Sequence, residues 1–336
     1  MPPSVRRPGR VQRLPAVLIL SLLLAAGGCG RDAPDAPGAA NLNVVATIAP
    51  IVDLAERVAG DRVQVKALIP PGENGHTYQP RPGDGRMLTE ADLFIDPGFD
   101  LNQLITQLTE VLPKDATRLM LGEVAVPRDE LISETQPCHF GHCHDAVVNG
   151  HLWTNPRYAV AFAEHIASTL TRLDPPGRAT YEANATRLSQ QIEELDSAFQ
   201  QALDTIPAAN RKMVVYHNAW AYFARRYDLR LVGAIQPNDF AEPSASEVRA
   251  MIAQIKTERV PAFFGSEVFP SDVLETVAEE TKAKYVKEIS DDRLPGNPGD
   301  PANSYAGMMV VNVRTIVTAL GGTATALDGL ETKASE

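Results

Sequence analysis

Residues 180–206 read TYEANATRLSQQIEELDSAFQQALDTI. Apolar side chains recur through this stretch every three, four or seven residues, at Tyr181, Leu188, Ile192, Leu195, Phe199, Leu203 and Ile206. This spacing places them on one stripe of a helix. The stretch contains no glycine or proline, and it lies between Pro175-Pro176-Gly177 and Pro207. Because such residues interrupt helices, we predict one long, unbroken helix here.

Strand-like and helix-like segments alternate on both sides of this helix, which predicts an α/β fold with mostly parallel sheets. Before it we expect strands at 43–50, 62–69 and 91–95, with helices at 51–58 and 102–111. After it we expect strands at 212–216, 229–235, 262–265 and 285–289, with helices at 218–227, 244–256, 272–281 and 304–320. We therefore predict an N-terminal lobe (43–175), a rigid connecting helix (176–207), a C-terminal lobe (208–325) and a tail (326–336).

The charge balance excludes one class of partner. The 336 residues include 31 basic and 42 acidic side chains, a net charge of −11. Four of the basic residues precede residue 29, where no acid occurs, so the remainder has 27 basic and 42 acidic residues, or −15. Binding to nucleic acid needs clustered basic side chains, so we expect no nucleic-acid partner.

The first 28 residues are typical of a secretory signal peptide. The segment up to Arg13 is basic, and residues 14–28 then carry no charge. Fifteen such residues are too few for a membrane span, which needs about 20. The run ends in Ala25-Ala26-Gly27-Gly28-Cys29, which resembles the bacterial lipoprotein cleavage box except for Ala26, where leucine is usual.

We therefore expect export to the periplasm or to the outer face of the cell membrane, with lipidation at Cys29. Cleavage nearby without lipidation is the alternative. Residues 29–42 are rich in proline, alanine, glycine and aspartate, and this composition predicts a flexible tether.

Three histidines and two aspartates lie where predicted strands end. His76 follows the strand at 62–69, His217 follows the strand at 212–216, and His151 precedes a helix that begins at Pro156. Asp291 and Asp292 follow the strand at 285–289. Open α/β sheets bind ligands at the carboxyl ends of their strands. Three imidazoles and one carboxylate would complete a tetrahedral Zn²⁺ site.

The sequence around these residues resembles a known family. HTYQP at 76–80, HLWTNPR at 151–157 and HNAWAYF at 217–223 occur in this order, followed by AEPS at 241–244 and FGSE at 264–267. Together they are similar to the metal-binding subunits of ABC importers for zinc and manganese, over residues 44–320. The resemblance implies two α/β lobes bridged by one rigid helix, with the metal between the lobes. It also implies a membrane permease and an ATPase as partners, and we expect the subunit itself to be a monomer.

The resemblance assigns the metal ligands one by one. His76, His151 and His217 match the family's first three ligands. The fourth is an aspartate in a Glu-Leu-x-Ser-Asp-x-Leu-like stretch, and an alignment without a gap from Glu288 to Leu294 places it at Asp292. The neighbouring Asp291 remains an alternative.

The donor atoms favour Zn²⁺ over Mn²⁺, because Mn²⁺ prefers more oxygen ligands. The residue at the third position, His217, points the same way, since some manganese-specific members carry a carboxylate there. We therefore expect a zinc-binding subunit, with a manganese-binding subunit as the alternative. Zinc binds more tightly than manganese at most such sites, so affinity alone does not identify the transported metal.

Glu267 occupies a position where the family has a carboxylate after a strand. We expect it to accept a proton from a ligand imidazole. The alternatives are a carboxylate at a helix N-terminus and a simple salt bridge.

A short loop, CHFGHCH at 138–144, combines Cys138, His139, His142, Cys143 and His144. Zinc importers of this family often carry a histidine-rich loop here, although longer and without cysteines. One interpretation is a second, weaker metal site that captures zinc near the cleft. Another is a Cys138–Cys143 disulfide, which export to an oxidising compartment would permit. A third is a solvated loop without function.

Two other classes of function remain. A secreted zinc hydrolase would need an open coordination position and a general base such as Glu267. Neither His-Glu-x-x-His nor Gly-x-Ser-x-Gly occurs in the sequence, so we expect no enzyme. A surface adhesin would use a binding surface independent of the histidines.

Overall fold

The computed structural model describes residues 40–134, 147–236, 244–266 and 273–332. The predicted signal peptide, nearly all of the tether, Cys29, the 138–144 loop and Glu267 lie outside these ranges.

The N-terminal lobe is built on a four-stranded parallel sheet with the strand order β2-β1-β3-β4. Its strands are β1 (Val44–Ala46), β2 (Val65–Ala67), β3 (Leu93–Asp96) and β4 (Thr117–Met120). The helices between them are α1 (Ala49–Ala59), α2 (Pro82–Thr89), α3 (Gln103–Leu108) and α4 (Leu121–Ala125). A short antiparallel pair, β5 (Ser133–Glu134) and β6 (Val147–Val148), lies outside this sheet.

The C-terminal lobe repeats the arrangement, with a parallel sheet in the order β10-β9-β7-β8. Its strands are β7 (Lys212–His217), β8 (Arg230–Gln236), β9 (Ala262–Ser266) and β10 (Lys284–Ile289). Its helices are α7 (Ala221–Arg226), α8 (Ala245–Glu258), α9 (Val273–Thr281) and α10 (Tyr305–Ala319). Both lobes are therefore α/β units with parallel sheets, as the alternating pattern predicts.

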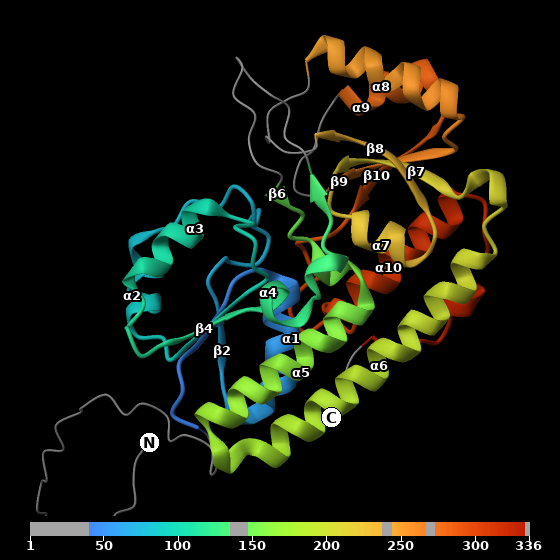
Figure 1. The fold of residues 1–336 in the computed structure, drawn as a ribbon. Helices are drawn as coiled ribbons and strands as arrows, with labels where there is room; N and C mark the ends of the chain where they lie inside the picture. The colour runs from blue at the N-terminus through green and yellow to red at the C-terminus, as the bar shows by residue number, and fades with distance from the viewer. Residues whose placement is uncertain (1–39, 135–146, 237–243, 267–272, 333–336) are drawn as a thin grey trace, which may run out of the picture. The chain divides into compact units, whose positions relative to one another are not determined.

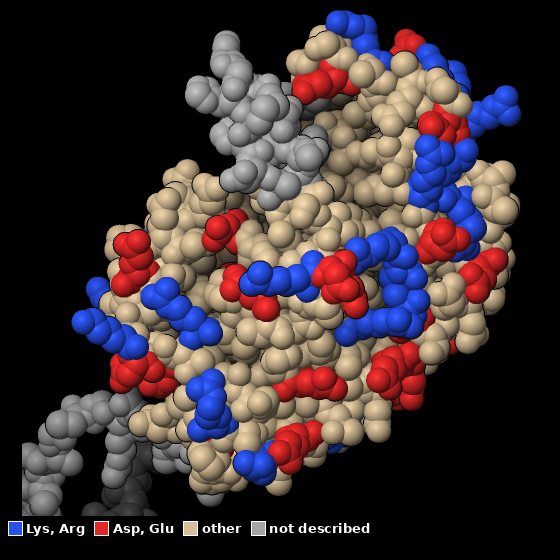
Figure 2. All heavy atoms as spheres, in the orientation of Figure 1, with Lys and Arg blue, Asp and Glu red and all other residues tan. Residues whose placement is uncertain are grey.

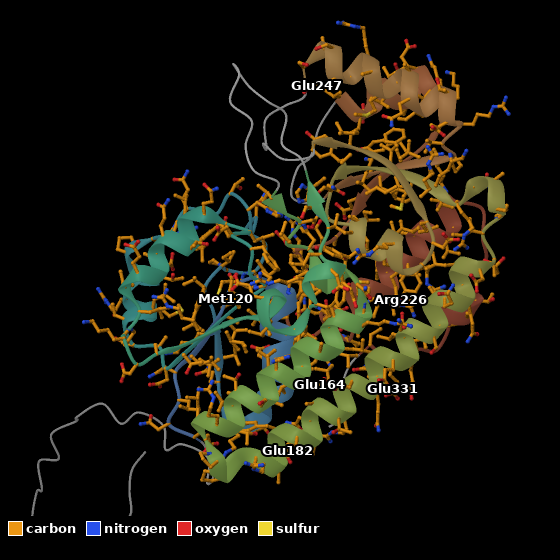
Figure 3. The ribbon with its side chains drawn as sticks, viewed as in Figure 1. Met120, Glu164, Glu182, Arg226, Glu247 and Glu331 are labelled. Carbon is orange, nitrogen blue, oxygen red and sulfur yellow. The ribbon has the colours of Figure 1, made fainter. Side chains whose placement is uncertain are left out.

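The predicted long helix is α6 (Arg178–Asp204), which is 27 residues long. It runs beside α5 (Pro156–Leu173) and continues past it toward the second lobe (Figure 1). All seven residues of the predicted apolar stripe are buried. Glu164 of α5 and Glu182 of α6 are exposed and face outward (Figure 3). From the second lobe, Arg226 of α7 donates a hydrogen bond to Asp196 of α6 (Nη2 to Oδ2, 2.5 Å).

One continuous hydrophobic core joins the two lobes. It includes β1 and α1 of the first lobe, α5 and α6, and α7 and α10 of the second. A second, smaller core fills the space between the C-terminal sheet and the helices α8 and α9. Because α6 contributes to the shared core along its length, it fixes the lobes to each other through packing as well as through the chain.

Basic and acidic side chains are interspersed over the face seen in Figure 2, and several of them lie side by side. Within the described residues, no helix is both long enough and apolar enough to cross a membrane.

Candidate metal centre

His76 lies in the loop that follows β2, and several hydrogen bonds shape that loop. Its backbone N–H donates to Asn74 Oδ1 at 2.8 Å. The side chain of Asn102, which caps α3, donates from Nδ2 to the carbonyl of Gly75 at 2.8 Å and to that of Tyr78 at 3.2 Å. His76 itself is only 8% exposed. The loop therefore holds the imidazole inside the protein.

His151 immediately precedes the short 3₁₀ turn that leads into α5. Asn149 holds it twice, because its Oδ1 accepts from the backbone N–H of His151 at 3.0 Å and contacts ring atom Nδ1 at 2.9 Å. Asn149 also donates from Nδ2 to the carbonyl of Asn218 at 2.7 Å, in the second lobe. With Nδ1 engaged by Asn149 Oδ1, Nε2 is the ring nitrogen that points into the cluster.

The second lobe contributes His217, the last residue of β7, and Asp291, which follows β10. Both are buried. The indole of Trp153, beside His151, donates to the backbone carbonyl of Asp291 at 2.8 Å. Asn312 of α10 accepts from the N–H of Ser290 at 2.8 Å and donates to its carbonyl at 2.6 Å. The segment that carries Asp291 is thus held from both lobes.

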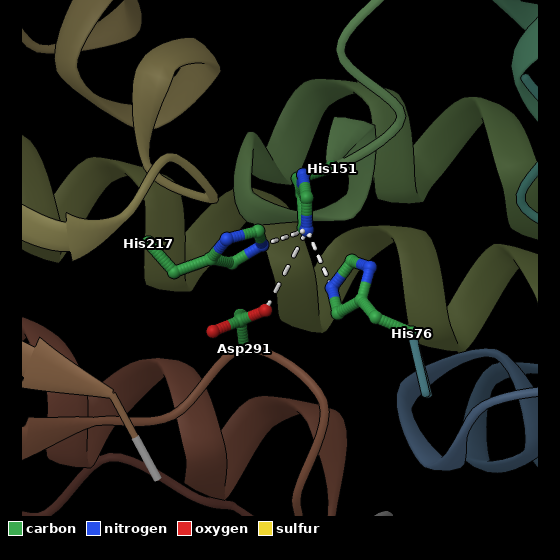
Figure 4. Close-up of side chains that lie close together, drawn as sticks. All are labelled: His76, His151, His217 and Asp291. Atoms are coloured by element: carbon green, nitrogen blue, oxygen red, sulfur yellow. Dashed lines mark hydrogen bonds and ion pairs between the residues drawn. The ribbon is translucent and has the colours of Figure 1, made fainter. Parts of the chain in front are cut away.

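The four side chains converge, as Figure 4 shows. His151 Nε2 is 3.1 Å from His76 Nε2, 2.9 Å from His217 Nε2 and 3.7 Å from Asp291 Oδ2. One ligand atom from each of the four residues lies within 4.8 Å of all the others. Nitrogens bound to one tetrahedral Zn²⁺ would be about 3.3 Å apart. The separations are therefore close to those that a single bound ion would impose.

Asp292 lies beside this cluster. Its Oδ2 is 3.8 Å from His76 Nε2 and accepts a hydrogen bond from the N–H of Gly75 at 3.1 Å. A side chain at Gly75 would bring a Cβ within 2.5 Å of the same oxygen, so only glycine allows this approach. Of the two aspartates, Asp291 has a carboxylate oxygen within 4.8 Å of a ring nitrogen of each histidine, and Asp292 bridges the cluster to the Gly75 loop.

Burial shifts the pKa values of His76, His151 and Asp292 toward the neutral forms of these side chains. It lowers the pKa of His76 to about 4, although a hydrogen bond with the backbone of Leu101 opposes the shift. Burial also lowers the pKa of His151 well below its usual range, and the nearby His217 and His76 rings add to this effect. His76 and His151 are therefore neutral at physiological pH, the form that binds metal. Burial raises the pKa of Asp292 to about 7 against the opposing effects of Gly75 and Arg293.

Three supporting residues were not identified from the sequence as part of the site: Asn149, Asn102 and Trp153. Asn149 lies only two residues before His151, and that spacing was a usable signal, because short asparagine side chains often bond backbone groups two residues ahead. The role of Asn102 is visible only in three dimensions, since it is far from His76 in sequence. Glu267 and the 138–144 loop lie outside the described residues.

Comparison with known proteins agrees with the fold and the cluster. The profile of the family described as "Zinc-uptake complex component A periplasmic" matches residues 44–319. The "Manganese-binding lipoprotein MntA" of Halalkalibacterium halodurans is 27% identical and covers 90% of this chain and 97% of its own length. The "Iron-binding protein YfeA" of Yersinia pestis is also 27% identical, covering 93% of this chain and 96% of its own.

Solved structures agree as well. The "periplasmic zinc binding protein TroA" from Treponema pallidum superposes with a TM-score of 0.73 at 25% identity, covering 82% of this chain and 98% of its own. A manganese-bound periplasmic metal binding protein from Candidatus Liberibacter asiaticus shares the fold, with a TM-score of 0.71 at 24% identity and coverage of 82% and 98%.

These proteins are solute-binding proteins and not enzymes, which rules out the zinc hydrolase. The fold, the buried histidine cluster and a profile match across most of the sequence lead to one assignment: the chain belongs to the family of zinc-uptake complex component A proteins, the extracytoplasmic metal-binding subunits of ABC importers.

Proposed function

We propose that this protein captures one Zn²⁺ ion between its lobes and delivers it to a membrane permease driven by an ATPase. The observation that carries this proposal is the convergence of three imidazoles and one carboxylate, all buried, whose ligand atoms lie within 4.8 Å of one another. The lobes supply two ligands each, since His76 and His151 belong to the first and His217 and Asp291 to the second. A bound ion would therefore hold the lobes together. The relatives that are lipoproteins support an anchor at Cys29.

Asp291 is our proposed fourth ligand. Its Oδ2 lies 3.7 Å from His151 Nε2 and shares the compact group with all three imidazoles. Asp292 is engaged by the Gly75 N–H instead. This assignment replaces the ungapped alignment, which favoured Asp292, with a choice based on geometry.

The donor set favours zinc. Three nitrogens and one oxygen suit the tetrahedral preference of Zn²⁺, whereas Mn²⁺ prefers sites rich in oxygen. The printed names of the relatives support manganese as the second candidate, since MntA is a manganese-binding lipoprotein. Iron and zinc are also named among relatives, so the family includes different metals.

A competition titration tests the proposal. Purified, metal-free protein is titrated with Zn²⁺ against a chelator of known affinity, and separately with Mn²⁺. We expect one tight Zn²⁺ per molecule at the cluster and weaker binding of Mn²⁺. The variant His151→Ala loses this site, while His165→Ala, on the partly exposed side of α5, keeps wild-type affinity. Wild-type zinc affinity in His151→Ala contradicts the proposal.

Divalent metals follow a similar order of affinity at most protein sites, so the metal that binds most tightly is not always the one transported. A second measurement is needed to identify the transported metal. Metal analysis of the protein isolated from its native envelope should find zinc. Manganese in stoichiometric amount would favour the manganese-binding alternative.

A further inference from the structure

A small hollow lies next to the metal cluster, and Asp292 is part of its lining. It lies between the start of α1 and the loop at residues 70–75, and Ala49, Pro70, Glu73, Gly75 and Asp292 are among the residues that line it. Its volume is about 10 Å³, room for roughly one water molecule. At the inner end, Asp292 Oδ2 is 3.8 Å from His76 Nε2.

The two charged residues that line the hollow are both acidic. The side chain of Asp292 at the inner end is 1% exposed, whereas that of Glu73 at the rim is 43% exposed. Glu73 pairs with Arg81 (Nη2 to Oε1, 2.6 Å), whose side chain is 61% exposed. Exposed pairs of this kind contribute little stability, so an approaching cation can replace the guanidinium at small cost.

Hydrogen bonds attach the loop over the hollow to the second lobe. The N–H of Gly75 donates to Asp292 at 3.1 Å, and Arg293 donates to the carbonyl of Gly72 at 3.5 Å, a long hydrogen bond. The hollow is too narrow for a fully hydrated ion, so passage needs both loss of water and a small displacement of this loop. Carboxylate oxygens at each end replace the lost water ligands.

We propose that this hollow is the route by which the metal enters and leaves, and that Glu73 is the carboxylate that first receives it. This inference rests on the proposed function, because it assumes that the histidine cluster binds the cargo. Glu73 acts by raising the local concentration of cations at the rim, and such an effect weakens with ionic strength.

Stopped-flow kinetics of Zn²⁺ binding tests the route. The signal is tryptophan fluorescence, because the ring of Trp153 lies 5.2 Å from the ring of His151. Ala49→Phe narrows the hollow without touching a ligand. A narrowed route slows association and dissociation by the same factor, so the equilibrium affinity stays at the wild-type value. Wild-type rates in Ala49→Phe would overturn the inference.

A second variant tests the rim charge. Glu73→Gln lowers the association rate constant roughly threefold at low salt, and the difference shrinks in 0.5 M salt, roughly a 4 Å screening length. The control, Glu90→Gln, removes the same charge from an exposed position at the end of α2 and leaves the rate unchanged. Equal rates for Glu73→Gln and wild type at low salt would contradict the role of Glu73. Failure of the proposed function itself is distinguishable, because wild-type protein would then bind no zinc at the cluster.

Discussion

At the scale of single residues, the cluster depends on side chains that fix the direction of each ligand. Asn149 orients His151, Asn102 holds the loop of His76, and Trp153 holds the backbone of Asp291. Mutation of groups of this kind typically lowers metal affinity by about 10–100-fold. They also explain why four polar side chains stay in close contact in a buried place.

The two adjacent aspartates give a direct test at this scale. Asp291→Asn removes a proposed ligand charge, so we expect zinc affinity to fall by at least about 100-fold. Asp292→Asn leaves the four ligands in place and should cost only about tenfold, the range of supporting residues. Chelator competition with both variants measures the difference. The reverse order would identify Asp292 as the ligand.

Proton release on zinc binding follows from the shifted pKa values. The pKa of Asp292 is raised to about 7, so at pH 6 the group is mostly protonated, and a nearby cation favours its charged form. Zinc affinity should therefore rise with pH through about 7, with release of up to one proton from this group. His76, with its pKa lowered to about 4, is already neutral and releases none.

Calorimetry at pH 6 in two buffers of different ionisation enthalpy counts these protons. We expect Asp292→Asn to release fewer protons than wild type. An unchanged count would show that the protons come from other groups. An exposed histidine would lose affinity below about pH 6.5, its ordinary pKa, but burial moves this loss to lower pH for His76.

The sequence predicts His76, His151 and His217 as ligands because recognisable motifs surround each of them, and the structure brings these three side chains together. For the fourth ligand it favours Asp292 and leaves Asp291 as the alternative, because the two are neighbours and a one-residue shift exchanges them. β10 pairs with β9 through a register irregularity between Val286 and Ile289, immediately before these aspartates. An alignment without gaps cannot take such a local irregularity into account.

At the scale of elements, α6 is the component whose sequence pattern is clearest. Its apolar stripe is buried against α5 and α1 on one side and α10 on the other. Phe199 lies in the last two turns of α6 and is fully buried. The helix therefore stabilises both lobes together.

Truncation of Phe199 measures that contribution. We expect Phe199→Ala to lower the free energy of unfolding by about 3–5 kcal/mol, the usual cost of a large cavity in a core. Gln201→Ala, on the exposed face of the same helix, should have little effect. Urea denaturation followed by circular dichroism gives both values. A loss below about 1 kcal/mol in Phe199→Ala would contradict a shared core at this position.

Some elements gave no clear signal in the sequence. β4 is an edge strand in which only Leu119 is buried. Its sequence therefore needs no run of apolar residues, and Thr117–Met120 contains none. α2 begins with Pro82, and its eight residues include Gly83 and Gly85, which disfavour helix in isolation. Both elements form because the rest of the lobe packs against them, and local pattern cannot reveal such context.

At the scale of the whole molecule, the two lobes are connected by more than the chain. The continuous core joins them, and Asp53 of α1 accepts a hydrogen bond from the N–H of Tyr305 at the start of α10 at 2.9 Å. Asn149 and Trp153 add hydrogen bonds from the first lobe to the second. Wide opening of the cleft would break all of these contacts at once.

We therefore expect metal binding to change the relation of the lobes only slightly. Small-angle X-ray scattering of the metal-free and zinc-loaded protein should give the same radius of gyration within error. A clear contraction on adding zinc would show a wide hinge and contradict a rigid α6. Zinc should still raise the melting temperature, because at 100 times its dissociation constant a ligand adds about 2.7 kcal/mol of stability.

The position of the metal tests the central claim most directly. Crystals of the zinc-loaded protein, measured at the zinc absorption edge, locate the ion by its anomalous scattering. We expect one strong peak at about 2.0–2.2 Å from Nε2 of His76, His151 and His217 and from a carboxylate oxygen of Asp291. A cluster without a peak, or a strong peak only at the 138–144 loop, would contradict that claim.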